Sequence, residues 1–551
     1  MSVYAELLPK PRWFARHMSD VVPWRAVAAP GVILHKQTHA LQRSYLMRGP
    51  DLSTEVQEVV GAEFLLANNV FKRLGGAWTV HCEAQRLPVT TYPEHEFPSP
   101  VATLIDDERR RAMQVDPRSF ETAYDLTFTW QPPSAVKTTW MPIFVSGTTN
   151  GNGHGPQASL SDFITQADYL IYLLRGMLTM ARPLTTDETL TSLHSCVSDR
   201  WHPVSYPELP VDVDVMVCDT PFHGGWYPQL GRFHLRVCSI QSYPPKSVAN
   251  ALQAIDHLRF PYRWSTRWIA YERQSQDYLL ARVQKQWVGQ EKGALTRIGE
   301  LMSRKDARVI NTTATNKAMD TDEARQEVGA DIIAYGDFTA TVAVWDDDLD
   351  QADAKIRDVM QILDSRGFVT ILEKEHATAA WLSSMPGNRA DSVRRTPHHS
   401  LTFAHLAPGL SAAWTGPERD EHLKQGPWFL AHTEGSTLFR VVNHTLDNGH
   451  YKVVGPTRAG KSVLANVMVV SLVQYQGAQV SWWDIDGSAR CLTLCLGGNY
   501  HHIGADGIGF QPYAGIHDDV ERAWAFEWTL WLLDGAKVPL TEVVQRYISS
   551  G

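Results

Sequence analysis

One eight-residue segment has the residue types and spacing needed to bind nucleotide phosphates. It fits the pattern G-x-x-x-x-G-K-[ST] and consists of Gly455, Pro456, Thr457, Arg458, Ala459, Gly460, Lys461 and Ser462. In such a loop, backbone N–H groups surround the phosphates and the positive end of the next helix attracts them. We expect Lys461 to reach the β- and γ-phosphates and the Ser462 hydroxyl to hold the bridging Mg²⁺ ion. The segment therefore predicts a site for ATP and Mg²⁺.

The residues on either side of this loop predict the elements that would position it. Tyr451–Val454 is short and rich in valine, as expected of a strand, and the apolar run from Ser462 to Tyr475 predicts a helix that packs on a sheet. Arg458 stands where many phosphate loops carry a small residue. It either stiffens the loop or contacts a phosphate, and a left-handed backbone there would be strained.

Nucleotide hydrolysis also needs a carboxylate that holds Mg²⁺ or orients water, and two acids follow apolar runs after the loop. Asp484 follows Trp482-Trp483, at the end of a predicted strand. It either holds Mg²⁺ or orients water, or it has the structural role of an acid in a turn. Asp534 follows a run in which Trp524, Trp528 and Trp531 share one helical face, which predicts a packing helix instead.

Length and composition indicate a soluble, multidomain protein. A chain of 551 residues is expected to form about three or four domains. The net charge of -9 does not support direct DNA binding. Six scattered cysteines indicate a reducing compartment, and with no evident signal peptide or membrane span we expect a cytoplasmic protein.

Two histidine pairs, His398-His399 and His501-His502, are weak candidates for metal ligation. Adjacent residues on a strand point to opposite faces, so neither pair can form a bidentate site alone. No cysteine or carboxylate spacing completes either site. We therefore do not predict a metal site at either pair.

The order of the predicted elements indicates an α/β chain in three parts. Residues 1–270 predict a mixed α/β domain, with strands at 28–34, 77–82 and 124–130 and a helix that begins after Ser161-Asp162. Residues 271–424 predict a long helix to about 302 and then a compact α/β domain, for which a ferredoxin-like fold is one candidate. Its elements are predicted at 320–327, 334–345, 348–366, 368–373 and 376–384. Residues 425–551 predict an incomplete P-loop NTPase domain.

Several further segments resemble the TrbE-like conjugal transfer ATPases of type IV secretion systems. Before the loop, the similar segments are Ala29–Val32, Arg48–Leu52, Ala379–Asn388, Arg394–Pro397, Pro408–Gly416 and Asp447–His450. After it, they are Trp482–Gly487, Gly497–Tyr500 and Gly509–Pro512. The resemblance thus spans nearly the whole chain.

This resemblance implies mixed α/β amino-terminal domains followed by the first part of a RecA-like P-loop NTPase domain. It implies partners in the secretion channel and other secretion ATPases, peripheral association with the bacterial inner membrane, and a hexamer. It also implies that the Walker B acid, the γ-phosphate sensor and the arginine finger lie in a region beyond Gly551. The sequence itself offers no convincing Walker B acid or arginine finger.

Three functions follow as hypotheses. The first is an ATP-binding subunit of a conjugative secretion apparatus, which energises channel assembly or substrate transfer by hydrolysis when its motor domain is complete. The second is a structural docking component that binds nucleotide without turnover. The third is a DNA-translocating motor of the FtsK type, which the acidic charge and long amino-terminal region fit less well.

Overall fold

The computed structural model describes residues 17–550, apart from 90–91, 94, 116–118, 133–155, 245–246, 277–331, 392, 434, 486, 506, 508 and 510. Two compact units are present. Unit 1 comprises Met1–Pro93 and Arg109–Tyr451, and unit 2 comprises Glu94–Glu108 and Lys452–Gly551. The predicted helix at 271–302 lies outside the described residues after its first turn at 273–276, and the predicted helix at 320–327 lies outside them entirely.

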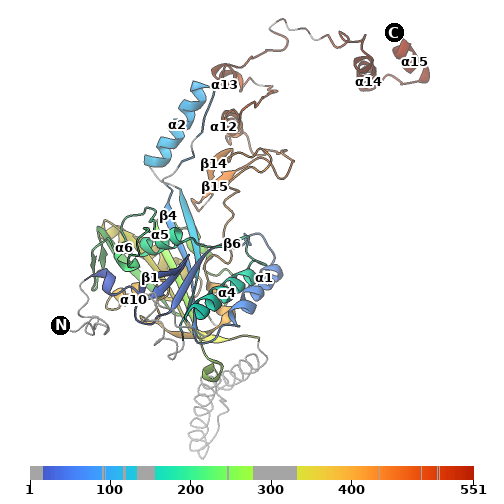
Figure 1. Cartoon of the computed structure of the whole chain (residues 1–551). Helices are drawn as coiled ribbons and strands as arrows, with labels where there is room; N and C mark the ends of the chain where they lie inside the picture. The colour runs from blue at the N-terminus through green and yellow to red at the C-terminus, as the bar shows by residue number, and fades with distance from the viewer. Residues whose placement is uncertain are drawn as a thin grey trace, which may run out of the picture. The chain divides into compact units, whose positions relative to one another are not determined.

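Unit 1 is built on a 13-stranded antiparallel sheet (Figure 1). Its strands are β1 (Trp24–Ala29), β2 (Val32–His35), β3 (Leu41–Arg48), β4 (Trp78–Pro88), β5 (Phe120–Trp130), β6 (Met180–Pro183), β7 (Phe222–His223), β8 (Gln229–Leu230), β9 (Phe233–Ser242), β10 (Tyr262–Ala270), β11 (Tyr335–Asp346), β12 (Val369–Leu372) and β13 (Thr396–His399). The strand order is β1-β2-β3-β5-β4-β10-β11-β9-β8-β7, while β6, β12 and β13 pair with β3, β9 and β11. A separate hairpin joins β14 (Phe429–His432) to β15 (Leu438–Val441).

Helices cover both faces of this sheet in unit 1. One apolar core includes residues of α1 (Gln57–Phe71), α4 (Pro156–Leu174), α9 (Leu349–Ser365) and α11 (Ser400–Leu406). A second core includes residues of α5 (Thr186–Val197), α6 (Val213–Val217) and α10 (Ala377–Ser383). Before residue 452, the described residues also include two short 3₁₀ helices, η3 (Met18–Asp20) and η4 (Gln253–His257), and the helix α2 (Pro100–Val115), whose residues up to Glu108 belong to unit 2.

The period-two geometry of the strands explains why there are two cores. Neighbouring residues on a strand point to opposite faces. On β11, Val342 and Val344 therefore belong to the first core, whereas Ala343 and Trp345 belong to the second. Because both faces are covered by helices, β11 is apolar along most of its length rather than alternating between apolar and polar.

The centre of the sheet has a polar face that is nevertheless buried. Arg263 and Arg267 on β10 are 3% and 1% exposed and project from the same face. Arg263 forms an ion pair with buried Glu83 of β4 and donates to the carbonyl of Ser384 (3.0 Å). Arg267 donates to the carbonyls of Asn388 (2.7 Å) and Asp391 (2.8 Å). Burial, together with nearby arginines, lowers the pKa of Arg267 to about 9.

The turn after α10 covers this polar face, and a glycine allows it to approach closely. Gly387 has a φ of +82°, and a Cβ atom there would lie 2.4 Å from side-chain atoms of His35 and Gln42. Trp24 Nε1 also donates to the carbonyl of Pro386 (3.0 Å). The segment at Ala379–Asn388, which resembles the family motif, therefore supplies carbonyl acceptors to both buried arginines.

Most of the predicted strands and helices of unit 1 form. The strands predicted at 124–130 and 334–345 correspond to β5 and β11, and the helix at 348–366 corresponds to α9, which Asp348 caps by accepting from Gln351 N. The predicted start of a helix after Ser161-Asp162 is wrong, because α4 begins at Pro156 and continues through both residues. The predicted mixed α/β class is confirmed.

The predicted domain boundaries differ from the divisions in the structure. β10 ends at the predicted boundary of residue 270 but pairs along its whole length with β11, so the elements after 334 extend the same sheet instead of forming a separate ferredoxin-like domain. The β14–β15 hairpin belongs to unit 1, and unit 2 resumes at Lys452 rather than near residue 425.

Unit 2 after Tyr451 contains helices but no strand among its described residues. These helices are α12 (Lys461–Leu472), α13 (Arg490–Cys495), α14 (Asp519–Gly535) and α15 (Glu542–Ser550). The strands predicted at Tyr451–Val454 and before Asp484 do not form there. A parallel strand is stabilised by neighbours on both sides, and the described portion of this unit supplies none.

The helix predicted around Asp534 is present as α14, but the packing predicted for its tryptophan face is not observed, because Ala525 is its one buried residue. Trp524 and Trp528 stack with their ring centroids 5.7 Å apart, and Tyr513 packs against Trp528. Trp531 is 70% exposed. Over the described part of the chain, no helix combines the length and the apolar character needed to cross a membrane.

Removing one partner of the buried Arg263–Glu83 pair should strongly destabilise unit 1. We expect Glu83→Ala to lower the free energy of unfolding by about 3–5 kcal/mol, because the Arg263 charge would remain buried and unpaired. As a control, Arg182→Ala removes the exposed ion pair with Glu188 and should cost at most about 1 kcal/mol. Urea denaturation followed by tryptophan fluorescence would measure both, and equal losses would contradict this view of the buried pair.

Candidate phosphate-binding loop

The predicted phosphate loop leads directly into a helix. α12 begins at Lys461, and Gly460 before it has a φ of +87°, a left-handed conformation that glycine adopts without a steric penalty. The first hydrogen bond at this end of the helix runs from Leu464 N to Gly460 O (2.9 Å). The predicted loop is thus followed by the predicted helix, but the strand expected before the loop does not form.

The Lys461 side chain folds back across the loop. Its Nζ donates to the carbonyls of Gly455 (2.9 Å) and Pro456 (2.7 Å), the first two residues of the motif. Ala459 N also donates to Pro456 O (3.3 Å), which curls the chain between them. The ammonium group therefore lies beside the start of the loop, and both carbonyl contacts are neutral acceptors that a phosphate could replace with charge-assisted hydrogen bonds.

Donors are available at the start of α12. The first N–H groups of a helix have no intrahelical acceptor, and these groups carry the positive end of the helix dipole. Here they belong to Lys461, Ser462 and Val463. Ser462 is exposed, so its hydroxyl can reach a metal ion held beside a bound phosphate. The donors suit an anion, and the hydroxyl oxygen suits Mg²⁺.

Arg458 has a left-handed backbone in this loop. Its φ is +67°, which is costly for a residue with a Cβ atom. The side chain is exposed, so it can either stiffen the loop or contact a phosphate. The predicted backbone strain is present, because this bulky residue has a left-handed conformation.

Asp484 takes part in a local turn. Its Oδ2 accepts from Ala489 N (2.8 Å) and Ser488 Oγ (3.2 Å), immediately before α13. These contacts match the structural role of an acid in a turn. A role for Asp484 with Mg²⁺ or water stays a prediction, because the described contacts do not join it to the phosphate loop.

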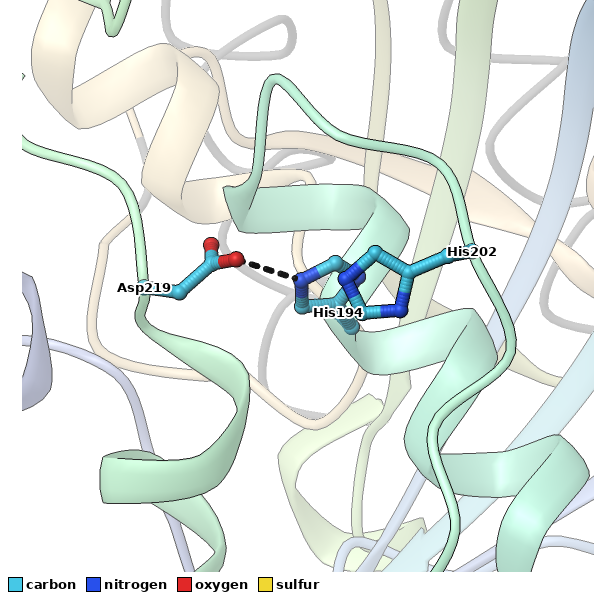
Figure 2. A group of neighbouring side chains, drawn as sticks. All are labelled: His194, His202 and Asp219. Atoms are coloured by element: carbon cyan, nitrogen blue, oxygen red, sulfur yellow. Dashed lines mark hydrogen bonds and ion pairs between the residues drawn. The ribbon is translucent and has the colours of Figure 1, made fainter.

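The structure also brings together three side chains that the sequence analysis did not identify. His194, His202 and Asp219 of unit 1 lie close together, with the His194 ring between the other two side chains in Figure 2. Their spacings of eight and seventeen residues match no metal-binding motif, and only the packing of α5 against α6 brings them close.

Two family models match separate regions of this chain. Residues 31–138 match the amino-terminal domain of the type IV secretion system ATPase VirB4/TrbE. Residues 296–394 match the CagE, TrbE, VirB family, a component of the type IV transporter system. The first match covers β2 to β5, and the second includes β11, α9, β12 and α10.

The curated relatives extend the similarity over nearly the whole chain. The conjugal transfer protein TrbE of Rhizobium radiobacter is 28% identical over 96% of this chain, which spans 67% of that relative. In Sinorhizobium fredii, the first part of a probable conjugal transfer protein TrbE is 30% identical, and 88% of its length is covered by 23% of this chain. The second part from the same organism is 27% identical over 64% of this chain, which spans 54% of its length.

The fold and the loop define a mixed α/β protein that carries a P-loop motif. With the two family models and the relatives, this chain belongs to the VirB4/TrbE family of type IV secretion system ATPases. Membership is consistent with the predicted RecA-like class for the region around the loop. The alignment with the Rhizobium radiobacter protein covers 96% of the chain and so includes the loop.

Two substitutions of Arg458 should reveal whether its side chain or its backbone matters. Arg458→Gly removes the strain of a left-handed residue, about 1 kcal/mol, whereas Arg458→Ala keeps most of it. If the side chain does not contact phosphate, we expect Arg458→Gly to bind ATP at least as tightly as the parent chain and more tightly than Arg458→Ala. Titration with a fluorescent ATP analogue measures this order, and an equal loss in both variants would instead assign the arginine to phosphate binding.

Proposed function

We propose that this chain is an ATP-binding subunit of a conjugative type IV secretion apparatus and that Gly455–Ser462 is its nucleotide site. The observation that most strongly supports this proposal is the position of the Lys461 side chain. Its ammonium group lies at the start of a loop that ends in a left-handed glycine and a helix N-terminus. Family membership supports the same assignment, because both family descriptions name a type IV system and one names an ATPase.

Nucleotide binding would use groups that are already close to their required positions. Lys461 would exchange two carbonyl acceptors for the β- and γ-phosphate oxygens, and the charge on both partners would strengthen the new contacts. The N–H groups at the start of α12 would donate to the same phosphates. Ser462 would hold Mg²⁺ through its hydroxyl, and the ion would neutralise charge that develops on the phosphates during hydrolysis.

The names of the relatives suggest where this binding is used. TrbE proteins are named for conjugal transfer, so we infer that ATP hydrolysis energises channel assembly or substrate transfer. The channel, the other secretion ATPases, a hexameric assembly and a peripheral position on the inner membrane belong to this proposal. Unit 1, with its large sheet and two helical layers, would be the docking region.

One observation favours a second candidate, a docking component that binds nucleotide without turnover. Asp484 is the best-placed acid after the loop, but its carboxylate caps the turn before α13 through Ser488 and Ala489. These hydrogen bonds hold the Asp484 carboxylate as an acid with a structural role in a turn would be held. The two candidates share the nucleotide site and differ only in hydrolysis.

Lys461→Ala tests the nucleotide site that both candidates require. Hydrogen bonds to charged groups contribute about 1.5–3 kcal/mol each, so we expect ATP affinity to fall by about 10- to 150-fold. Lys374→Ala removes an exposed lysine of unit 1 and should leave affinity unchanged. Calorimetric titration with Mg-ATP measures both, and equal affinity in the parent chain and Lys461→Ala would refute the proposed site.

Turnover separates the two candidates once binding has been measured. Phosphate release by the parent chain above the level of Lys461→Ala supports a motor, and release at that level together with normal ATP binding supports the docking component. Asp484→Asn then tests the acid, because loss of turnover with unchanged ATP affinity assigns Asp484 to hydrolysis. Asp534→Asn on α14 is the matched control and should have no effect on either measurement.

A further inference from the structure

A cluster of three potential metal ligands lies in unit 1, apart from the phosphate loop in the sequence. His194 is on α5, His202 is in the loop that follows, and Asp219 comes two residues after the end of α6 (Figure 2). One ligand atom from each residue lies within 4.8 Å of the other two. The imidazole rings of His194 and His202 have centroids 4.6 Å apart.

The spacing of these atoms suits a single d-block cation. Zn²⁺ binds imidazole nitrogen and carboxylate oxygen at about 2.0–2.2 Å, so neighbouring ligands in a tetrahedral shell lie about 3.3 Å apart. The separation between His194 Nε2 and Asp219 Oδ2 is 3.2 Å. A metal ion could therefore take the place of the hydrogen bond between these two groups with little movement of either.

The hydrogen bond of His202 leaves its other ring nitrogen free to act as a ligand. Its Nδ1 lies 3.0 Å from the carbonyl of Pro203. A carbonyl oxygen only accepts, so Nδ1 must carry the proton, and neutral Nε2 then keeps its lone pair. Nε2 is the nitrogen directed toward His194 in Figure 2. A backbone partner of this kind commonly orients a metal-binding histidine.

The backbone of His202 is held on both sides. The Trp201 ring stacks on Phe233, with the ring centroids 5.7 Å apart. On the other side, Val204 N donates to Thr191 Oγ1 of α5 (2.9 Å). Because these contacts belong to the fold rather than to a ligand, His202 is positioned before any metal binds, which reduces the entropy lost on binding.

Asp219 is tied to the segment after α5 through a shared hydroxyl group. Thr220 Oγ1 lies within hydrogen-bonding distance of Asp219 Oδ1 (2.9 Å) and of Asp199 Oδ1 (3.0 Å), and it can donate to either. These contacts help to position the Asp219 carboxylate, whose oxygen is a suitable ligand for Zn²⁺.

A simple hydrogen bond accounts for only two of the three residues. His194 is 1% exposed, and its contact with Asp219 would by itself satisfy Nε2 of this ring. It does not explain why the Nε2 edge of His202, an exposed residue free to point into solvent, faces the same pair. Two imidazoles and one carboxylate with an exposed side form the ligand set of a three-residue zinc site with one open position.

We propose that His194, His202 and Asp219 bind a divalent d-block cation of the Zn²⁺ type, with a fourth position open to water. The ligands come from α5, the loop after it and the segment after α6. The ion would therefore cross-link three segments of the helical layer. This proposal does not depend on the proposed nucleotide function, because its ligands include no residue of the phosphate loop.

Binding of Zn²⁺ alone to the chelator-stripped chain tests the proposal. We expect one equivalent of Zn²⁺ to bind at this cluster. His202→Ala and Asp219→Asn should each weaken the Zn²⁺ affinity by at least about tenfold, because the loss of a group that only supports a metal ligand already has an effect of this size. Both residues are exposed, so both variants should fold. His376→Ala, an exposed histidine outside the cluster, is the matched control and should bind like the parent chain.

The exposed thiols of Cys491 and Cys495 could also bind zinc, so the experiment must separate them. All titrations use a Cys491→Ser/Cys495→Ser background, and Co²⁺ replaces Zn²⁺ in a parallel spectroscopic measurement. The expected spectrum shows ligand-field bands of a tetrahedral or five-coordinate ion, which His202→Ala abolishes and His376→Ala preserves. Zn²⁺ affinity that is unchanged by His202→Ala and Asp219→Asn, or no binding in this background, would overturn the proposal.

Discussion

The structure of unit 1 depends on how two buried guanidinium groups are satisfied. Arg263 and Arg267 project from the centre of a sheet that helices cover on both faces, and an unpaired charge in such a place would cost several kcal/mol. Glu83 supplies one partner, and backbone carbonyls from 384 to 391 supply the others. The turn after α10 must therefore sit on this face, and Gly387 allows it to do so.

Unit 2 shows the opposite situation around its functional loop. The phosphate loop and the start of α12 are largely exposed, and the neighbouring segments carry exposed apolar residues such as Val454, Val463 and Trp483. Local interactions are sufficient for the loop itself, since Lys461 and the left-handed Gly460 organise it within a few residues. They are not sufficient for parallel strands, which require partners distant in sequence. This contrast explains why a nucleotide motif can keep its local geometry where the expected sheet does not form.

The success of prediction from sequence varied with the range of the interactions involved. The helix α9 was predictable because its apolar residues recur at helical spacing and Asp348 provides a cap. The strand β5 was predictable from its alternation and the prolines that follow it. The start of α4 was not, because Ser161-Asp162 is as suitable for a cap as for an exposed turn within a helix. Local interactions also explain the helix that begins at Lys461 and the contact of this lysine with its own loop. The two strands predicted around the loop depend on partners distant in sequence.

The amino-acid sequence by itself determined the phosphate-loop motif, the mixed α/β class and the resemblance to the secretion ATPases, because each is encoded by residues close together in the chain. Only the tertiary structure decided that the elements after residue 334 join the sheet of the first 270 residues, because strand pairing is set by burial on both faces and not by strand propensity. It also brought His194, His202 and Asp219 together, since their contact depends on how α5 packs against α6 and no local pattern records that packing.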